Sequence, residues 1–349
     1  MNILSGNNDF FGLDLGSEGI RLVQLAGNGA KKSLVKYSFV EVNPKISQSD
    51  AKADQQKLAQ ILSELISKSQ ISTKNVAVSL PSNRVFTTVT DLEKLSHEEL
   101  TKSINYQVDS LIPTPIEDSK IDWALIGDSP KDSTKVEILL SSITNSYVEK
   151  TLDLLEGIGL NVIAFEPSTL ALSRSLITLD SKSVDLIVYI DSMGTDIAIV
   201  MDSFPRVLRT VAIGNQSIIR SSAQNLNVDD KQAEQLVYKF GISKDKLEGQ
   251  VYNALIGSLD SLSSEIEKSI RFFANRYGER GIDNIIVSGG ASTIPEFPLY
   301  LANKFNINVE IGNPWINVAY DISRQNELLN IANHFSVAVG LAERNNGRI

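Results

Sequence analysis

The sequence predicts an α/β fold with two similar lobes and one inserted subdomain. Two apolar strands flank a short turn with an aspartate at residues 10–25, and the same arrangement returns at residues 186–200. Further strands and amphipathic helices follow each hairpin, which is the pattern of a mixed sheet covered by helices. Between the hairpins, residues 83–163 break this order with strands and helices of their own. We therefore expect a βαββα insert in a two-lobed molecule.

The first lobe is predicted from the hairpin, two more strands and a helix. Residues 33–42 predict a third strand, and residues 76–80 form a short apolar strand that stops at Pro81. Between them, residues 53–69 carry apolar side chains at the spacing of three and four that marks one buried helix face.

The insert and the return to the first lobe are predicted from four strands and two helices. These are the strands 84–92, 120–126, 135–143 and 160–165 and the helices 96–111 and 145–158. Ser96 and Glu99 form a capping box at the start of the first helix. Pro167, a residue favoured at a first helical position, opens a further helix that reaches residue 179.

The second lobe repeats the strand–turn–strand motif at Asp191 and continues with strands and helices. The predicted elements are the strands 206–213, 283–288 and 307–311 and the helices that begin at Ser217, cover 229–240 and 251–277, open at Pro295 and cover 328–343. We assign residues 1–82, 164–180 and 320–349 to the first lobe, 83–163 to the insert and 181–319 to the second lobe.

Composition excludes several classes of function. The formal net charge of −9 argues against non-specific binding to nucleic acid or to an anionic membrane. Cysteine is absent, and His97 and His334 are the only histidines, which leaves little for a zinc site. No apolar run approaches the roughly 18 residues that span a bilayer. We expect a soluble cytoplasmic protein without a nucleic-acid partner and without membrane insertion of its own.

Asp14 and Asp191 are the first candidate functional residues. A carboxylate at the end of a buried strand is costly unless it meets a cation or a hydrogen-bond donor. The small residues beside each aspartate let backbone N–H groups approach a phosphate closely. Taken singly, each turn is better explained as a structural β-turn. As a pair, they predict two lobes that hold one nucleotide with a divalent cation between them.

Three further positions have both a functional and a structural explanation. The junction at Gly289 and Gly290 can present amides to a nucleotide, or can serve close packing of a strand and a helix. Gly214 can contact a nucleotide, although a simple helix cap at Ser217 is slightly favoured. Glu166 can orient a water, or can be a first-turn acid favoured by the helix dipole, which we prefer from the sequence. No P-loop pattern is present.

In their order, these motifs resemble the actin/hexokinase/Hsp70 architecture, a ribonuclease H-like ATPase fold. They are more closely similar to the PilM family of type IV pilus assembly, in the FtsA/actin superfamily. The resemblance covers nearly the whole chain and depends on residues 12–17 with Arg21, 76–81, 157–167, 229–241 and 288–297. It implies an actin-like fold whose insert is a 1C or SHS2-like subdomain.

The resemblance also implies the cofactors ATP and Mg²⁺. Asp14 and Asp191 would hold the metal, largely through water, because magnesium dehydrates reluctantly. Glu166 would be the catalytic position. The phosphates and nucleoside would be bound by Gly16, Ser17, Arg21, Gly194, Thr195, Gly214, Glu234, Gly289, Gly290 and Ser292.

Two departures from the family pattern bear on catalysis. Met193 stands where the second phosphate turn usually has its first glycine, and Val237 replaces a lysine, with Lys239 two places on. A methionine lacks the access of glycine to positive φ and adds bulk near the phosphates. We therefore expect ATP binding with slow hydrolysis at most, the nucleotide acting as a structural ligand.

Partners and location are implied by the same resemblance. The family's partner is the short cytoplasmic N-terminal segment of PilN, a bitopic membrane protein, expected between the first lobe and the insert. Contacts with other pilus platform and motor proteins, a homo-oligomeric ring and a peripheral position at the inner face of the cytoplasmic membrane are also implied. The open alternatives are a nucleotide-free adaptor of a type II secretion or competence system, an FtsA-like divisome protein, a filament-forming actin and a small-molecule kinase of this architecture.

Overall fold

The computed structural model describes residues 9–27, 29, 31–278 and 280–344, and the chain divides into two units. The first unit contains residues 1–171 and 337–349, and the second contains residues 172–336. The chain crosses from one to the other within α5 (Ser168–Leu176) and returns within α10 (Gln325–Glu343). Parts of the predicted first lobe, residues 1–8 and 345–349, lie outside the described residues. The predicted boundaries of the two lobes and the insert stay a prediction.

The first unit is organised around a five-stranded arrangement in the order β3-β2-β1-β4-β8. Its strands are β1 (Phe11–Leu15), β2 (Gly19–Ala26), β3 (Lys32–Glu41), β4 (Asn75–Leu80) and β8 (Asn161–Pro167). β1, β2 and β3 are antiparallel neighbours, whereas β4 runs parallel to both β1 and β8. The predicted hairpin and the strands that follow it are confirmed.

One helix closes the core of this sheet. α2 (Lys52–Ser69) buries Leu58, Leu62 and Leu65 against apolar side chains of β1, β2 and β4. The three leucines lie at the spacing of three and four that the sequence predicts for one buried face. The short α1 (Pro44–Ser47), capped by the side chain of Asn43, precedes α2.

The insert has the predicted βαββα order. It comprises β5 (Phe86–Glu93), α3 (His97–Leu111), β6 (Ser119–Asp128), β7 (Lys135–Thr144) and α4 (Asn145–Gly157). The strands form an antiparallel sheet in the order β5-β7-β6, and α3 packs Leu100, Ile104 and Val108 against it. The capping box of Ser96 and Glu99 is present, as predicted.

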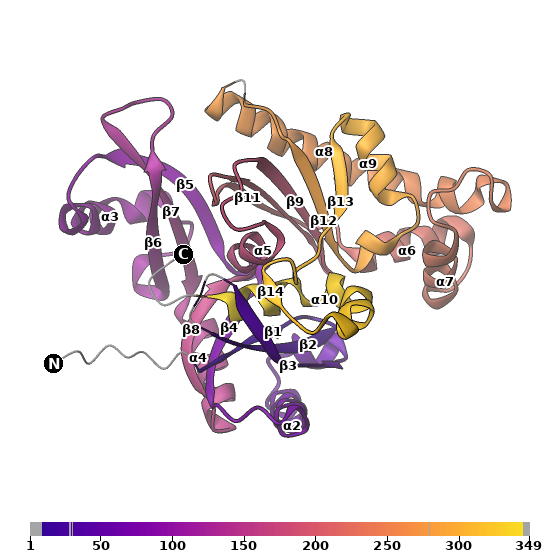
Figure 1. Cartoon of the computed structure of the whole chain (residues 1–349), viewed down its shortest axis with the longest axis horizontal. Coiled ribbons are helices and arrows are strands. Elements are labelled where there is room, and N and C mark those ends of the chain that lie inside the picture. The colour runs from indigo at the N-terminus through magenta and orange to yellow at the C-terminus, as the bar shows by residue number, and fades with distance from the viewer. Residues whose placement is uncertain (1–8, 28, 30, 279, 345–349) are drawn as a thin grey trace. The chain divides into compact units, whose positions relative to one another are not determined.

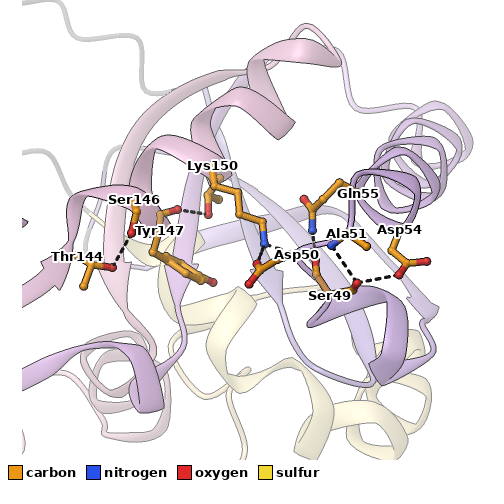
Figure 2. Close-up of polar contacts among 10 residues, drawn as sticks. Ser49, Asp50, Ala51, Asp54, Gln55, Thr144, Ser146, Tyr147 and Lys150 are labelled. Atoms are coloured by element: carbon orange, nitrogen blue, oxygen red, sulfur yellow. Dashed lines mark hydrogen bonds and ion pairs between the residues drawn. The ribbon is translucent and has the colours of Figure 1, made fainter.

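A polar junction ties α4 to the segment between α1 and α2 (Figure 2). Lys150 forms an ion pair with Asp50 and donates to the carbonyl oxygen of Ser49 at 3.4 Å. That carbonyl also accepts a hydrogen bond from Gln55 at 2.6 Å. Because the side chain of Asp50 is 85% exposed, the ion pair orients these elements and adds little stability.

The second unit repeats the strand arrangement of the first. Its sheet has the order β11-β10-β9-β12-β13, formed by β9 (Val184–Ile190), β10 (Thr195–Met201), β11 (Phe204–Val211), β12 (Asn284–Gly289) and β13 (Asn308–Ile311). Three antiparallel strands are again followed by two parallel ones. This equivalence, visible within each unit in Figure 1, confirms the prediction of two similar halves.

Four helices complete the core of the second unit. They are α6 (Asn215–Leu226), α7 (Asp230–Phe240), α8 (Gln250–Tyr277) and α9 (Phe297–Phe305). α8, the strongest helical prediction, runs for 28 residues and buries Leu255, Leu259 and Ile266 against the sheet.

The predicted helix starts at Pro167 and Pro295 were wrong. α9 begins at Phe297, with Pro298 in its first turn, because Glu296 has a φ of +67°, which a right-handed helix opened by Pro295 cannot contain. α5 begins after Pro167, which is the last residue of β8. Pro167 tolerates this position because the strand ends there and no further N–H is required.

Candidate functional site

Asp14 lies at the end of β1, in register with Arg21 on β2. One carboxylate oxygen accepts a hydrogen bond from the hydroxyl of Ser79 at 2.9 Å, and the other lies 3.6 Å from a guanidinium nitrogen of Arg21. The Ser79 hydroxyl also accepts from the backbone N–H of Leu15 at 3.1 Å. β4 and β2 therefore hold the carboxylate from both sides.

The Asp14 carboxylate is buried, with 6% of the residue exposed. Burial raises the pKa of Asp14 above its ordinary value, and the Arg21 cation and the Ser79 hydrogen bond only partly offset this effect. Arg21 and Ser79 therefore do not fully offset the cost of burying the ionised carboxylate. A cation bound at this position would favour the ionised form, so the residues present fit a metal ion or a metal-bound ligand.

The turn after Asp14 contains the predicted phosphate residues Gly16 and Ser17. Gly16 lies beside the Arg21 guanidinium. The Ser17 carbonyl accepts a hydrogen bond from Ser47 of α1, which fixes the turn against the helix. The hydroxyl oxygen of Ser17, by contrast, is buried and has no hydrogen-bond partner. The structure therefore brings Asp14, Gly16, Ser17 and Arg21 together.

Glu166 lies in β8 and not in the first turn of a helix, so the preferred explanation as a first-turn acid is wrong. It is 2% exposed and in register with Ser79 on β4. Its carboxylate accepts a hydrogen bond from Arg344 at 2.8 Å. Because β1, β4 and β8 are neighbouring parallel strands, Asp14, Ser79 and Glu166 lie at one edge of the sheet.

In the second unit, Asp191 follows β9 and opens the turn to β10. Its backbone N–H donates to the carbonyl of Gly194 at 2.9 Å, and its carbonyl accepts from the N–H of Asn215 at 2.9 Å. The N–H of Gln216 donates to the carbonyl of Ser192 at 3.0 Å. The start of α6 is therefore bonded to this turn.

Two hydroxyls in this turn have different environments. Thr195, a predicted phosphate residue, is fully buried and donates to the carbonyl of Ile213 at 2.6 Å, so its hydroxyl is committed to the fold. The hydroxyl of Ser192 is buried and has no hydrogen-bond partner. Ser17 of the first unit also has a buried hydroxyl without a partner, although it lies three residues after its aspartate and Ser192 directly follows Asp191. Ser192 was not among the predicted site residues.

Gly214 packs directly on the Asp191 turn. A Cβ atom at Gly214 would overlap the backbone of Ser192, Met193 and Gly194, so only glycine fits this close approach. Ser217 caps α6, as the sequence favours, although α6 begins at Asn215 and Ser217 acts from its third position. The Ser217 hydroxyl accepts from the N–H of Gly214 at 3.1 Å.

Met193 does not strain the turn. Its φ is not positive, and it is 45% exposed. A glycine at this position would offer access to positive φ, but the backbone here does not need it. The bulk of Met193 therefore remains the feature of this turn that departs from the family pattern.

The junction after β12 gathers the residues predicted for the nucleoside. Gly289 has φ +84° and its Cβ position would overlap the carbonyl of Ile190, so glycine is required for the fold. Ser292 is fully buried and donates to the carbonyl of Gly289 at 2.7 Å. A Cβ at Gly290 would meet only the Tyr238 hydroxyl, at 3.8 Å.

Tyr238 connects this junction with the start of α6. Its hydroxyl donates to the side-chain carbonyl of Asn215 at 2.9 Å. Glu234 lies one helical turn before Tyr238 on α7 and is exposed. The hydroxyl of Tyr238, a residue that was not predicted, thus bonds to Asn215, the neighbour of Gly214, and lies beside Gly290.

A family model described as type IV pilus assembly protein PilM matches residues 12–346. The chain belongs to the PilM family. The structure is similar to one from a PilM–PilN type IV pilus biogenesis complex, with a TM-score of 0.81 and 23% identity, over 95% of this chain and 97% of that chain.

Two other solved structures share the fold with the PilM-family chain. The ethanolamine utilization protein EutJ from Carboxydothermus hydrogenoformans has a TM-score of 0.57 and 12% identity, over 95% of this chain and 88% of that one. MreB5 of Spiroplasma citri bound to ADP has a TM-score of 0.54 and 15% identity, over 89% and 93%. The predicted actin-like fold and the predicted family are confirmed.

The described part of this PilM-family chain contains neither a candidate membrane span nor a ready-made metal cluster. No helix there combines the length and apolar character of a membrane span. No group of three or more His, Cys, Asp or Glu side chains among the described residues is arranged to hold a metal ion.

Proposed function

We propose that this PilM-family protein is a scaffold of type IV pilus assembly that binds magnesium–ATP and a PilN-like partner. The observation that supports nucleotide binding is the similarity of the two turns that contain Asp14 and Asp191. Each turn has an aspartate near the end of the first hairpin strand, and each contains a serine whose buried hydroxyl has no hydrogen-bond partner. These serines are Ser17, three residues after Asp14, and Ser192, directly after Asp191. Buried polar atoms are normally hydrogen-bonded, so an unpaired buried hydroxyl in each of the two turns supports a polar ligand.

In this proposal the Asp14 and Asp191 turns both contact the phosphates of one magnesium-bound nucleotide. The two carboxylates act on magnesium through its water ligands, which needs no ready-made cage of protein ligands. Ser17 and Ser192 donate to phosphate oxygens, Arg21 supplies positive charge, and Gly16, Gly194 and Thr195 shape the turns. Magnesium supplies charge neutralisation of the phosphates when it is bound.

The nucleoside part of the ligand is assigned to the Tyr238 region. Gly214, Glu234, Gly289, Gly290 and Ser292 surround it in the proposal, and Gly290 leaves open space beside Tyr238. Support comes from MreB5 of Spiroplasma citri, a solved structure with the same fold that is bound to ADP. Glu166 would accept a proton from the attacking water, and the rate of ATP hydrolysis would be low.

The partner part rests on the family and on the most similar fold described above. That structure is of a PilM–PilN complex. We assign to this chain the N-terminal cytoplasmic segment of a PilN-like bitopic membrane protein, with the first unit as its binding element. Other pilus platform proteins would join through the same assembly, and the protein would be held at the inner face of the cytoplasmic membrane through its partner.

Calorimetric titration tests the nucleotide part. Purified protein is titrated with ATP in the presence of magnesium, with ATP and EDTA, and with magnesium alone. Saturable heat is expected only when ATP and magnesium are both present, together with a higher unfolding temperature, because a ligand of the folded state stabilises it. Absence of heat and of a thermal shift at millimolar nucleotide would contradict the proposal.

A second titration tests the proposed binding of a PilN-like partner. A synthetic peptide with the cytoplasmic N-terminal sequence of the PilN-like protein encoded in the same genome is titrated into the protein, beside a scrambled peptide of the same composition. Saturable binding of the native peptide alone is expected. Equal binding of the two peptides, or none, would remove this part of the proposal and leave the nucleotide part standing.

Replacement of Ser17 and Ser192, whose hydroxyls are unpaired, should weaken nucleotide binding without lowering the stability of the fold. Ser17→Ala and Ser192→Ala remove buried groups without partners, so the free energy of unfolding of the nucleotide-free protein should stay constant or rise. Each variant should bind magnesium–ATP about tenfold more weakly, since one hydrogen bond to a charged group is lost. Denaturant unfolding and calorimetry measure the two quantities.

A matched serine provides the control. Ser63 is exposed on α2, and its hydroxyl bonds within the helix, to the carbonyl of Ala59. Ser63→Ala should leave nucleotide affinity unchanged. If Ser17→Ala and Ser192→Ala behave like Ser63→Ala in the titration, the two hydroxyls do not contact the nucleotide.

A further inference from the structure

An ion pair connects the residue that follows α10 with the predicted catalytic carboxylate. A guanidinium nitrogen of Arg344 lies 2.8 Å from a carboxylate oxygen of Glu166. The Glu166 side chain is 3% exposed, whereas the Arg344 side chain is 32% exposed. Arg344 is therefore the more exposed partner of the pair, and its guanidinium engages one oxygen of a buried carboxylate.

The backbone of this segment is fixed as well. Lys32 of β3 is 8% exposed, and its ammonium group donates to the carbonyl of Ala342 at 3.1 Å and to the carbonyl of Arg344 at 2.8 Å. A lysine on the last carbonyls of a helix satisfies acceptors that have no partner within the helix. Arg344 is thus held at its main chain by Lys32 and at its side chain by Glu166.

The position of Glu166 links this pair to the proposed nucleotide site. Glu166 is in register with Ser79 on β4, and Ser79 donates to Asp14. The Glu166 carboxylate is therefore two strands away from the proposed metal-binding carboxylate, at the same edge of the sheet. The oxygen of Glu166 that pairs with Arg344 is thus engaged by a cation and less available as a base toward water.

We propose that Arg344 is a positioning residue that holds Glu166 in an ion pair and restrains nucleotide hydrolysis. This inference rests on the proposed nucleotide binding. In hydrolysis, the oxygen of water bonds to the terminal phosphorus while the bond from that phosphorus to the bridging oxygen breaks. ADP leaves with that electron pair, and a carboxylate takes the proton of the water. A carboxylate oxygen engaged by Arg344 and shielded from solvent performs this proton transfer poorly.

Replacement of Arg344 in the full-length chain tests whether its guanidinium restrains hydrolysis. Arg344→Ala should raise kcat for magnesium–ATP hydrolysis about tenfold or more, while the calorimetric Kd stays within about twofold of the starting protein. Because Arg344 is partly exposed, water replaces it beside Glu166, so the protein should remain folded. Arg344→Lys, which keeps a cation, should stay near the original rate.

A readout independent of activity accompanies the kinetics. Carbodiimide labelling with mass spectrometry should show greater modification of Glu166 in Arg344→Ala than in the original protein and in Arg344→Lys. Arg324→Ala is the matched control, since Arg324 is 35% exposed and pairs with Glu327 at 3.2 Å on the second unit. It should change neither the rate nor the labelling of Glu166.

The outcomes separate this inference from the proposal beneath it. If the starting protein binds no magnesium–ATP, the proposed function fails and the inference fails with it. If nucleotide binds normally and Arg344→Ala neither raises kcat nor increases Glu166 labelling, the inference alone is overturned. Increased hydrolysis that is abolished again by Glu166→Gln in the Arg344→Ala background would support it.

Discussion

Asp14→Asn is expected to raise the stability of the nucleotide-free protein and to weaken magnesium–ATP binding by at least about 100-fold, or about 3 kcal/mol. Burial is the largest influence on Asp14 and raises the pKa of its carboxyl, so the neutral form is the better tolerated one. An asparagine imitates that form and still accepts the Ser79 hydrogen bond. It lacks the negative charge that a magnesium-bound ligand requires.

The pH dependence of unfolding follows from the same shift. Because the folded-state pKa of Asp14 lies above its ordinary value of 3.8, the folded state binds more protons than the unfolded state between these two values. The contribution of Asp14 to stability is therefore fully present below pH 3.8 and is lost as the pH rises through the raised folded pKa. Asp14→Asn should remove this decline, which denaturant titrations across that pH range would measure.

Asp50 is the matched control. Its pKa is lowered, chiefly by the hydrogen bond from Lys150, so its stabilising contribution has the opposite pH dependence and is lost as the pH falls. Asp50→Asn should leave magnesium–ATP affinity unchanged and should not raise stability at neutral pH. Equal behaviour of the two variants would show that burial of Asp14 has no functional consequence.

Gly289→Ala is expected to destabilise the second unit by on the order of 3 kcal/mol, through positive-φ strain and overlap with a neighbouring strand. Gly289 has φ +84°, and its missing Cβ would overlap the carbonyl of Ile190 on β9. β9 and β12 are parallel neighbours in the centre of the sheet, so the backbone there cannot move aside cheaply. Denaturant unfolding measures this loss.

The adjacent glycine should behave differently. Gly290 does not have a positive φ, and its Cβ would meet only Tyr238, at an ordinary contact distance of 3.8 Å. Gly290→Ala should therefore fold with little loss of stability and bind nucleotide more weakly if this space receives the nucleoside. A large loss of stability in Gly290→Ala, or none in Gly289→Ala, would contradict the assignment of a structural role to the first glycine and a binding role to the second.

The elements with strong local signals were predictable from the sequence. The periodic apolar face of α8, the capping box at Ser96 and the paired hairpins each depend on residues close in the chain. The start of α9 was not predictable in this way. Pro295 has the local features of a helix start, but the left-handed conformation of Glu296 moves the start of the helix to Phe297.

The environment of the candidate site depends on contacts between distant residues. Ser79, 65 positions from Asp14, and Arg344, 178 positions from Glu166, are brought into place only by the sheet and by α10. A serine in the apolar strand 76–80 was an available signal for the first contact, whereas nothing local marks Arg344. The burial of the Ser192 hydroxyl likewise arises from the packing of α6 on its turn.

The most direct test of the central claim is equilibrium dialysis with labelled ATP and magnesium. One nucleotide per chain is expected in the starting protein, and none in either Asp14→Asn or Asp191→Asn at the same concentration, because a single ligand requires both carboxylate turns. A chain that keeps its nucleotide when either aspartate alone is replaced would contradict the claim that the two turns bind one magnesium–nucleotide together.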